Sequence, residues 1–99
     1  MENVLQILKF DIYVQCMYNA IMPTIFVIGP FRIIINTKDH RPAHVHCIGP
    51  GIFVIIEIVT QEVIRNKGVF PKDIKRLQLV IEENKDVLMN EWRHYHEEE

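Results

Sequence analysis

The sequence predicts an α+β domain in which an antiparallel β-sheet of four to five short strands precedes an amphipathic C-terminal helix. Short β-branched apolar runs alternate with turn residues between positions 24 and 66, whereas apolar residues recur at helical spacing after Pro71. Strands that are followed by a helix, without strand–helix alternation, are typical of the α+β class. The 99 residues have the size of one domain, in which we regard residues 1–21 as an N-terminal extension.

Strand character is concentrated in five runs, at residues 24–28, 31–36, 43–48, 52–59 and 62–66. Gly29 and Pro30 close the first run, and the polar segment 37–42 with its proline is predicted to be a loop. Gly49-Pro50-Gly51 separates the third run from the fourth. Three turn-forming residues at this place predict a β-hairpin.

The register of this hairpin decides which side chains share a face of the sheet. We predict that Ile48 pairs with Ile52. This register gives one face with His44, His46, Val54 and Ile56, and an opposite face with Val45, Cys47, Phe53 and Ile55. Because the fourth run would be apolar on both faces, we expect the sheet to be covered on both sides. The helix would cover one face, so a homodimer or a protein partner is expected at the other unless residues 1–22 cover it.

The C-terminal third reads as helix. Pro71 suits a first helical position, because its fixed φ matches the helix and its missing N–H is not needed there. Apolar residues then recur at three- and four-residue steps, namely Ile74, Leu77, Ile81, Leu88, Trp92 and Tyr95. Asn84 lies on the same stripe and predicts a break or kink. His94 and His96 are expected at a frayed helix end, without a role in metal binding.

Composition and charge argue against several classes of protein. The formal net charge of −2 disfavours a general DNA- or RNA-coating protein, which would be strongly basic. No run reaches the roughly 18 apolar residues of a membrane span, so no membrane association is expected. The N-terminus lacks the basic start of a signal peptide. Two cysteines are too few for a disulfide framework, so the reducing cytoplasm is the expected location.

The candidate functional residues are concentrated in the polar segment 38–47, which contains three of the five histidines. His44 and His46 are two apart on a strand, so both side chains leave the same face. His40 lies in the preceding loop, from which it could fold back toward them. Asp39 could orient one imidazole through its Nδ1–H.

One interpretation of the cluster is a metal site. His40, His44 and His46 would offer three neutral imidazole nitrogens to zinc or another divalent ion. We nevertheless expect no tightly held metal, because no fourth ligand is evident. Cys47 is predicted to point away into the core as a buried, inert thiol, and Asp39 is better placed as an orienting group.

Two further interpretations remain open. In the second, the three histidines and Asp39 are catalytic: one histidine takes a proton from a 2′-hydroxyl of RNA and another protonates the leaving oxygen, without a metal. Lys38 and Arg41 would bind the phosphate. In the third, the histidines are structural and pack beside Val54 and Ile56.

The segment Asp39-His40-Arg41-Pro42-Ala43-His44-Val45-His46 resembles the D-H-x-P-P-H-F-H signature of a small bacterial family, domain of unknown function 4160. The helix start at Pro71 and the later residues up to Trp92 also resemble this family, so the similarity covers about residues 22–96. Ala43 stands where the second proline is usual and Val45 where an aromatic residue is usual. Neither departure removes an ionisable group. Met22 resembles the usual start of such proteins.

The resemblance implies a gene that lies beside another small gene, in an arrangement like that of toxin–antitoxin modules. We therefore predict a small cytoplasmic component of such a two-gene module, with a protein partner encoded nearby. If the chain is the toxin, a metal-independent ribonuclease that uses His40, His44 and His46 is expected. The alternatives are a non-enzymatic protein-binding module, as an antitoxin or regulatory partner, and a metal-binding regulatory protein.

Overall fold

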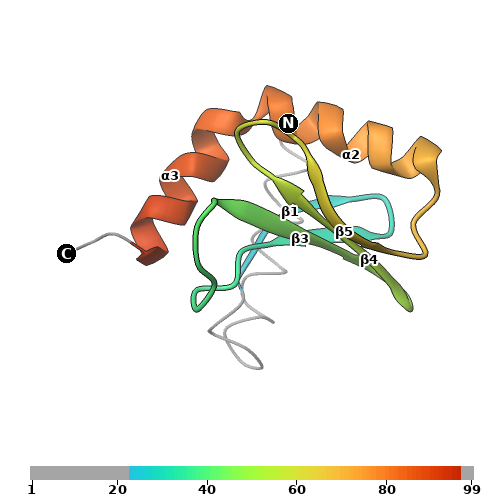
Figure 1. The fold of residues 1–99 in the computed structure, drawn as a ribbon, viewed down its shortest axis with the longest axis horizontal. Coiled ribbons are helices and arrows are strands. Elements are labelled where there is room, and N and C mark those ends of the chain that lie inside the picture. Colours follow the sequence, from blue (N-terminus) through green and yellow to red (C-terminus); the bar gives the residue numbers. More distant parts are fainter. Residues whose placement is uncertain (1–22, 97–99) are drawn as a thin grey trace.

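In the computed structural model, which describes residues 23–96, five strands form a single antiparallel sheet (Figure 1). The strands are β1 (Thr24–Ile28), β2 (Phe31–Ile34), β3 (His44–Gly49), β4 (Ile52–Glu57) and β5 (Val63–Lys67). Each strand pairs with the next along the chain, so the sheet order is β1-β2-β3-β4-β5. The predicted α+β architecture is confirmed. The predictions for residues 1–22 lie outside the described residues.

Two helices follow the sheet, α2 (Pro71–Glu83) and α3 (Lys85–His96). Pro71 is the first residue of α2, after Phe70 in an extended conformation. The predicted break at Asn84 is confirmed. Its φ of −116° leaves the helical region, and its side-chain Nδ2 donates to the carbonyl of Val80 at 2.8 Å. Neither helix is long and apolar enough to cross a membrane.

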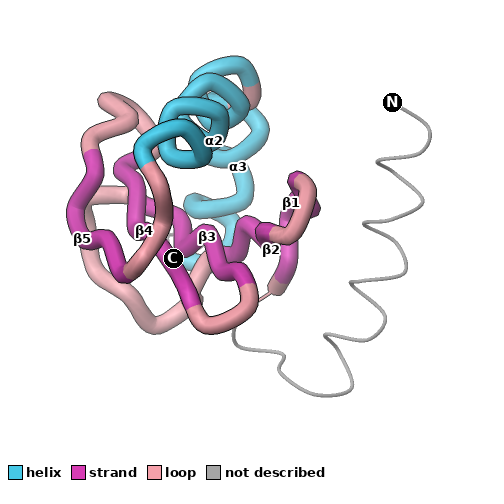
Figure 2. Tube along the Cα trace, turned by 90° about the vertical axis from the view of Figure 1, so that its right-hand side faces the viewer, coloured by secondary structure: helices cyan, strands magenta, loops and turns pink. Residues whose placement is uncertain are grey.

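The core lies between one face of the sheet and the two helices, which lie together on that side (Figure 2). The strands contribute side chains at alternate positions, as the two-residue period of a pleated strand requires. The fully buried apolar residues from the strands are Ile33, Val45, Cys47, Val54 and Ile56, and those from the helices are Leu77, Ile81, Leu88 and Trp92. Each large side chain of this kind contributes about 1.5–3 kcal/mol by leaving water.

The predicted register of the hairpin is wrong by one residue. Gly49 pairs with Ile52, so Pro50 and Gly51 alone form the turn. Proline followed by glycine at a φ of +72° suits a two-residue turn, whereas the prediction had counted Gly49 as part of the loop. A shift of one residue exchanges the two faces of a strand. His46 therefore pairs with Ile55 and His44 with Glu57.

The correction changes what surrounds the histidines. Val54 and Ile56 are fully buried on the core face beside Cys47, so they do not share a face with His44 and His46 as predicted. The prediction that Cys47 points into the core is confirmed. Burial raises the pKa of its thiol to about 12, which keeps the thiol protonated and inert.

The opposite face of the sheet carries the two histidines and no helix from the described part of the chain (Figure 1). Phe53 and Ile55 of β4 also lie on this face and are half-buried. The guanidinium carbon of Arg65 lies 5.4 Å from the centre of the Phe53 ring. The prediction that this face contacts a second copy or a partner protein therefore stays a prediction.

A candidate metal-binding site formed by Asp39, His44 and His46

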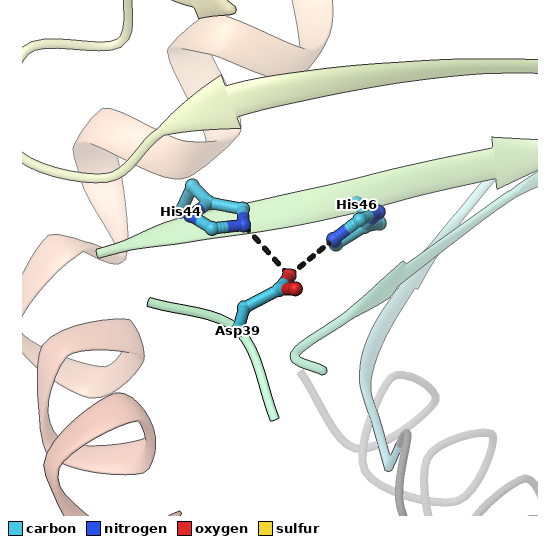
Figure 3. A group of neighbouring side chains, drawn as sticks. All are labelled: Asp39, His44 and His46. Carbon is cyan, nitrogen blue, oxygen red and sulfur yellow. Dashed lines mark hydrogen bonds and ion pairs between the residues drawn. The ribbon is translucent and has the colours of Figure 1, made fainter. Parts of the chain in front are cut away.

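The loop between β2 and β3 positions Asp39. The carbonyl of Asn36 accepts the N–H of Asp39 at 3.1 Å, and the Asn36 side-chain oxygen accepts the N–H of Lys38 at 2.9 Å. Asparagine favours such turns because its side chain can cap a backbone N–H two residues later. The far end of the loop is held by the Ala43 carbonyl, which accepts the N–H of Ile58 at 3.0 Å. The turn brings the Asp39 carboxylate back under β3 (Figure 3).

His44 and His46 leave the same face of β3 and converge on that carboxylate (Figure 3). The Nε2 atoms of both rings lie 2.7 Å from Oδ2 of Asp39. The two ring centres are 5.3 Å apart. The side chains of His44, His46 and Asp39 keep 13%, 18% and 26% of their surface exposed. The site is thus partly shielded from water yet open to a small ligand.

The other nitrogen of His44 is also engaged. Nδ1 of His44 lies 2.8 Å from the carbonyl oxygen of Pro42. A carbonyl only accepts, so Nδ1 donates, and a neutral imidazole then has a lone pair on Nε2. That lone pair faces the carboxylate of Asp39. The contact is favourable only if a positive charge lies between the two atoms, either a second proton on the imidazole or a metal ion.

The Asp39 carboxylate favours its ionised form. Burial raises its pKa, but the hydrogen bonds from His46 and His44 and the charges on these rings outweigh that effect and lower the pKa below its ordinary value of 3.8. At neutral pH, Asp39 is therefore an anion and an acceptor. Its negative charge makes the space between the three side chains attractive to a cation.

The structure brings together only part of the predicted cluster. Within residues 23–96, the ligand atoms of Asp39, His44 and His46 lie within 4.8 Å of one another, and His40 is not in this group. His40 is exposed in the loop, as are Lys38 and Arg41. The third ligand in the converging group is thus the Asp39 carboxylate, whereas the metal-site interpretation of the sequence had named His40.

Two aromatic residues of α3 complete the surroundings of the site, and sequence reasoning missed their part in it. The buried ring of Trp92 lies 5.4 Å from the ring of His44, at an angle of 50°. The ring of His96 stacks on the indole of Trp92, and the two ring centres are 3.7 Å apart. The four-residue spacing of Trp92 and His96 on a helix was the available signal, since such residues are neighbours.

Comparison with known proteins identifies the family to which the chain belongs. A family model described as "Domain of unknown function (DUF4160)" matches residues 30–93. The chain belongs to this family. The resemblance predicted from the Asp39–His46 segment is thereby confirmed, and the matched range of the DUF4160 domain contains all three converging side chains. No curated protein and no solved structure matches the chain.

Proposed function

We propose that this DUF4160 chain binds a divalent transition-metal ion between Asp39, His44 and His46. The observation that carries the proposal is the engagement of both His44 nitrogens, Nδ1 by the Pro42 carbonyl and Nε2 by the Asp39 carboxylate. Two acceptors on one imidazole call for an additional positive charge. A metal ion would supply that charge at a pH where the imidazoles are neutral.

The ligand types and their spacing support the proposal. Imidazole nitrogen and carboxylate oxygen bind zinc and related ions at about 2.0–2.2 Å, which places neighbouring ligand atoms about 3.3 Å apart in a tetrahedral site. The Nε2–Oδ2 separations are now 2.7 Å, a hydrogen-bond distance. Asp39 lies on a loop, so a retreat of the carboxylate by about half an ångström would admit the ion.

The hydrogen bond from His44 to Pro42 is the type that supports metal ligands. Histidine ligands usually donate their other N–H to a carbonyl or carboxylate, which fixes the tautomer and the ring orientation. Two histidines and one carboxylate also leave at least one coordination position for water or a substrate. We therefore propose a site with room for chemistry rather than a closed structural site.

Calorimetric titration of the untagged chain with Zn²⁺ or Co²⁺ tests the proposal. We expect one ion per chain, and loss of binding in Asp39→Asn, His44→Ala and His46→Ala. His40→Ala is the matched control, because His40 is a histidine of the same loop outside the converging group. Wild-type protein without saturable binding would contradict the proposal. Equal loss in His40→Ala would instead favour the set His40, His44 and His46.

A metal-independent ribonuclease is the second candidate function. Two histidines beside one carboxylate, with ring centres 5.3 Å apart, resemble an acid–base pair with an orienting group. Both nitrogens of His44 are however engaged, so His44 needs Asp39 to move before it can exchange a proton with RNA. RNA cleavage that persists in excess chelator and is lost in His46→Ala would favour this candidate over the metal site.

The cellular setting that we propose rests on the family resemblance: a cytoplasmic two-gene module in which the neighbouring gene encodes a protein partner. Co-expression of both genes, with one product tagged, tests this proposal. We expect the untagged product to copurify in equal amount. Growth arrest caused by this chain alone and relieved by the neighbour would identify it as the toxin, and absence of copurification would contradict the setting.

A further inference from the structure

We propose that His96, at the end of α3, is a positioning residue for the site formed by Asp39, His44 and His46. The inference deepens the proposed metal site and rests on it. Among the described residues, His96 forms no hydrogen bond, ion pair or ring contact with these three side chains. It acts instead on Asn36 and Trp92, each of which contacts one of them.

The first connection runs to Asp39 through the backbone of Asn36. Nε2 of His96 lies 3.1 Å from the carbonyl oxygen of Asn36. The same oxygen accepts the N–H of Asp39 at 3.1 Å. His96 and the Asp39 amide therefore share one acceptor, and the imidazole fixes the turn from which the Asp39 carboxylate projects. This contact joins residues 60 positions apart in the sequence.

The second connection runs to His44 through Trp92. The imidazole of His96 stacks almost parallel on the indole, at 14°, while the indole packs against the ring of His44. The buried Nε1 of Trp92 has no hydrogen-bond partner in the described part of the chain. The orientation of the indole therefore depends on packing, to which the stacked ring of His96 contributes.

Both nitrogens of His96 face carbonyl oxygens, since Nδ1 lies 2.8 Å from the carbonyl of Trp92. Whichever of these nitrogens carries a proton donates to its carbonyl, because a carbonyl oxygen only accepts. The stack on Trp92 and the hydrogen bonding of the ring to these carbonyls thus hold His96 in one orientation, as a positioning residue requires.

Two substitutions of His96 distinguish its hydrogen bond to Asn36 from its stacking on Trp92. His96→Phe keeps a ring on Trp92 but removes both donors, and His96→Gln keeps a donor that can reach Asn36. We expect His96→Phe to weaken Zn²⁺ binding about tenfold, the lower end of the range for residues that support metal ligands. We expect His96→Gln to restore part of that loss. His94→Phe is the control, because His94 is an exposed histidine of the same helix turn.

A second readout does not depend on metal. The NMR order parameter of the Asp39 amide in metal-free protein should fall in His96→Phe, while that of Val45 in the core should not. A purely structural role would instead lower thermal stability and leave the Zn²⁺ affinity of the folded protein and the Asp39 amide unchanged, which would overturn the inference. If wild-type protein binds no Zn²⁺, the proposed function fails. The order parameter of the Asp39 amide in metal-free protein then remains as the test of whether His96 positions Asp39. If His96→Phe does not fold, His96→Gln and His96→Ala replace it. We then expect the order parameter of the Asp39 amide to be unchanged in His96→Gln and lower in His96→Ala. Equal order parameters in these two variants would overturn the inference.

Discussion

Nε2 of His44 lies 2.7 Å from Oδ2 of Asp39, although the other nitrogen of the same ring already donates to a carbonyl. This pair links the local sequence to the proposed chemistry, because the imidazole and the carboxylate together need a positive charge between them, from a proton or a metal ion. The pair depends on the turn at Asn36, which the periodic patterns of helices and strands in the sequence do not predict. Its consequences for stability and reactivity can be measured separately.

The first prediction concerns Asp39 and pH. The pKa of Asp39 is lower in the folded chain than its ordinary value of 3.8, so ionisation of this group stabilises the fold above that pH. The contribution is lost as the pH falls through the lowered pKa of the folded state. We expect urea denaturation to show wild type more stable than Asp39→Asn at neutral pH, with the difference shrinking below pH 3.8. A difference that stays constant across this range would contradict the assignment.

The second prediction tests the hairpin register with two neighbouring isoleucines. Ile56 is fully buried on the core face, whereas Ile55 is half-buried on the histidine face. Ile56→Ala should therefore lower the free energy of unfolding by about 2–5 kcal/mol. Ile55→Ala should lower it by clearly less in the same denaturation experiment. The reverse order would support the register that was predicted from the sequence.

The third prediction concerns the thiol of Cys47. Its pKa is raised to about 12 by burial, so almost no thiolate is present near neutral pH. In a Cys16→Ser background, iodoacetamide should leave Cys47 unmodified in native protein and modify it in denaturant, as measured by mass spectrometry. Rapid modification of the native chain would show that Cys47 does not lie in the core.

The fourth prediction concerns self-association through the histidine face. Ile48 is 36% exposed and lies on this face, beside partly buried apolar neighbours. We expect light scattering to show a dimer of the chain beginning at Met22. Ile48→Glu should shift it toward monomer, because a charge buried at an interface is unfavourable. A monomer in both cases would contradict the prediction.

The elements were predictable because their signals are local. Pro71 marks the start of α2, and Asn84 interrupts its apolar stripe where the helix breaks. The register was not predictable from the same signals. Gly49-Pro50-Gly51 can form a loop of two or three residues, and only the strand pairing decides which.

The site was predictable in part for the same reason. His44 and His46 share a face because strands alternate, whatever the rest of the fold. The choice of Asp39 over His40 depends on the direction of a loop, which the Asn36 turn sets. The approach of His96 to Asn36 depends on how α3 packs beside the start of β3, where Trp92 meets His44, and residues this far apart leave no periodic signal in the sequence.

The central claim is that Asp39, His44 and His46 hold one metal ion. The most direct measurement is an anomalous difference map at the zinc absorption edge from crystals grown with Zn²⁺. We expect a single strong peak about 2.0–2.2 Å from Nε2 of His44, Nε2 of His46 and Oδ2 of Asp39, with the His44–Pro42 hydrogen bond retained. A map without a peak there, with both histidines still 2.7 Å from Asp39, would contradict the claim.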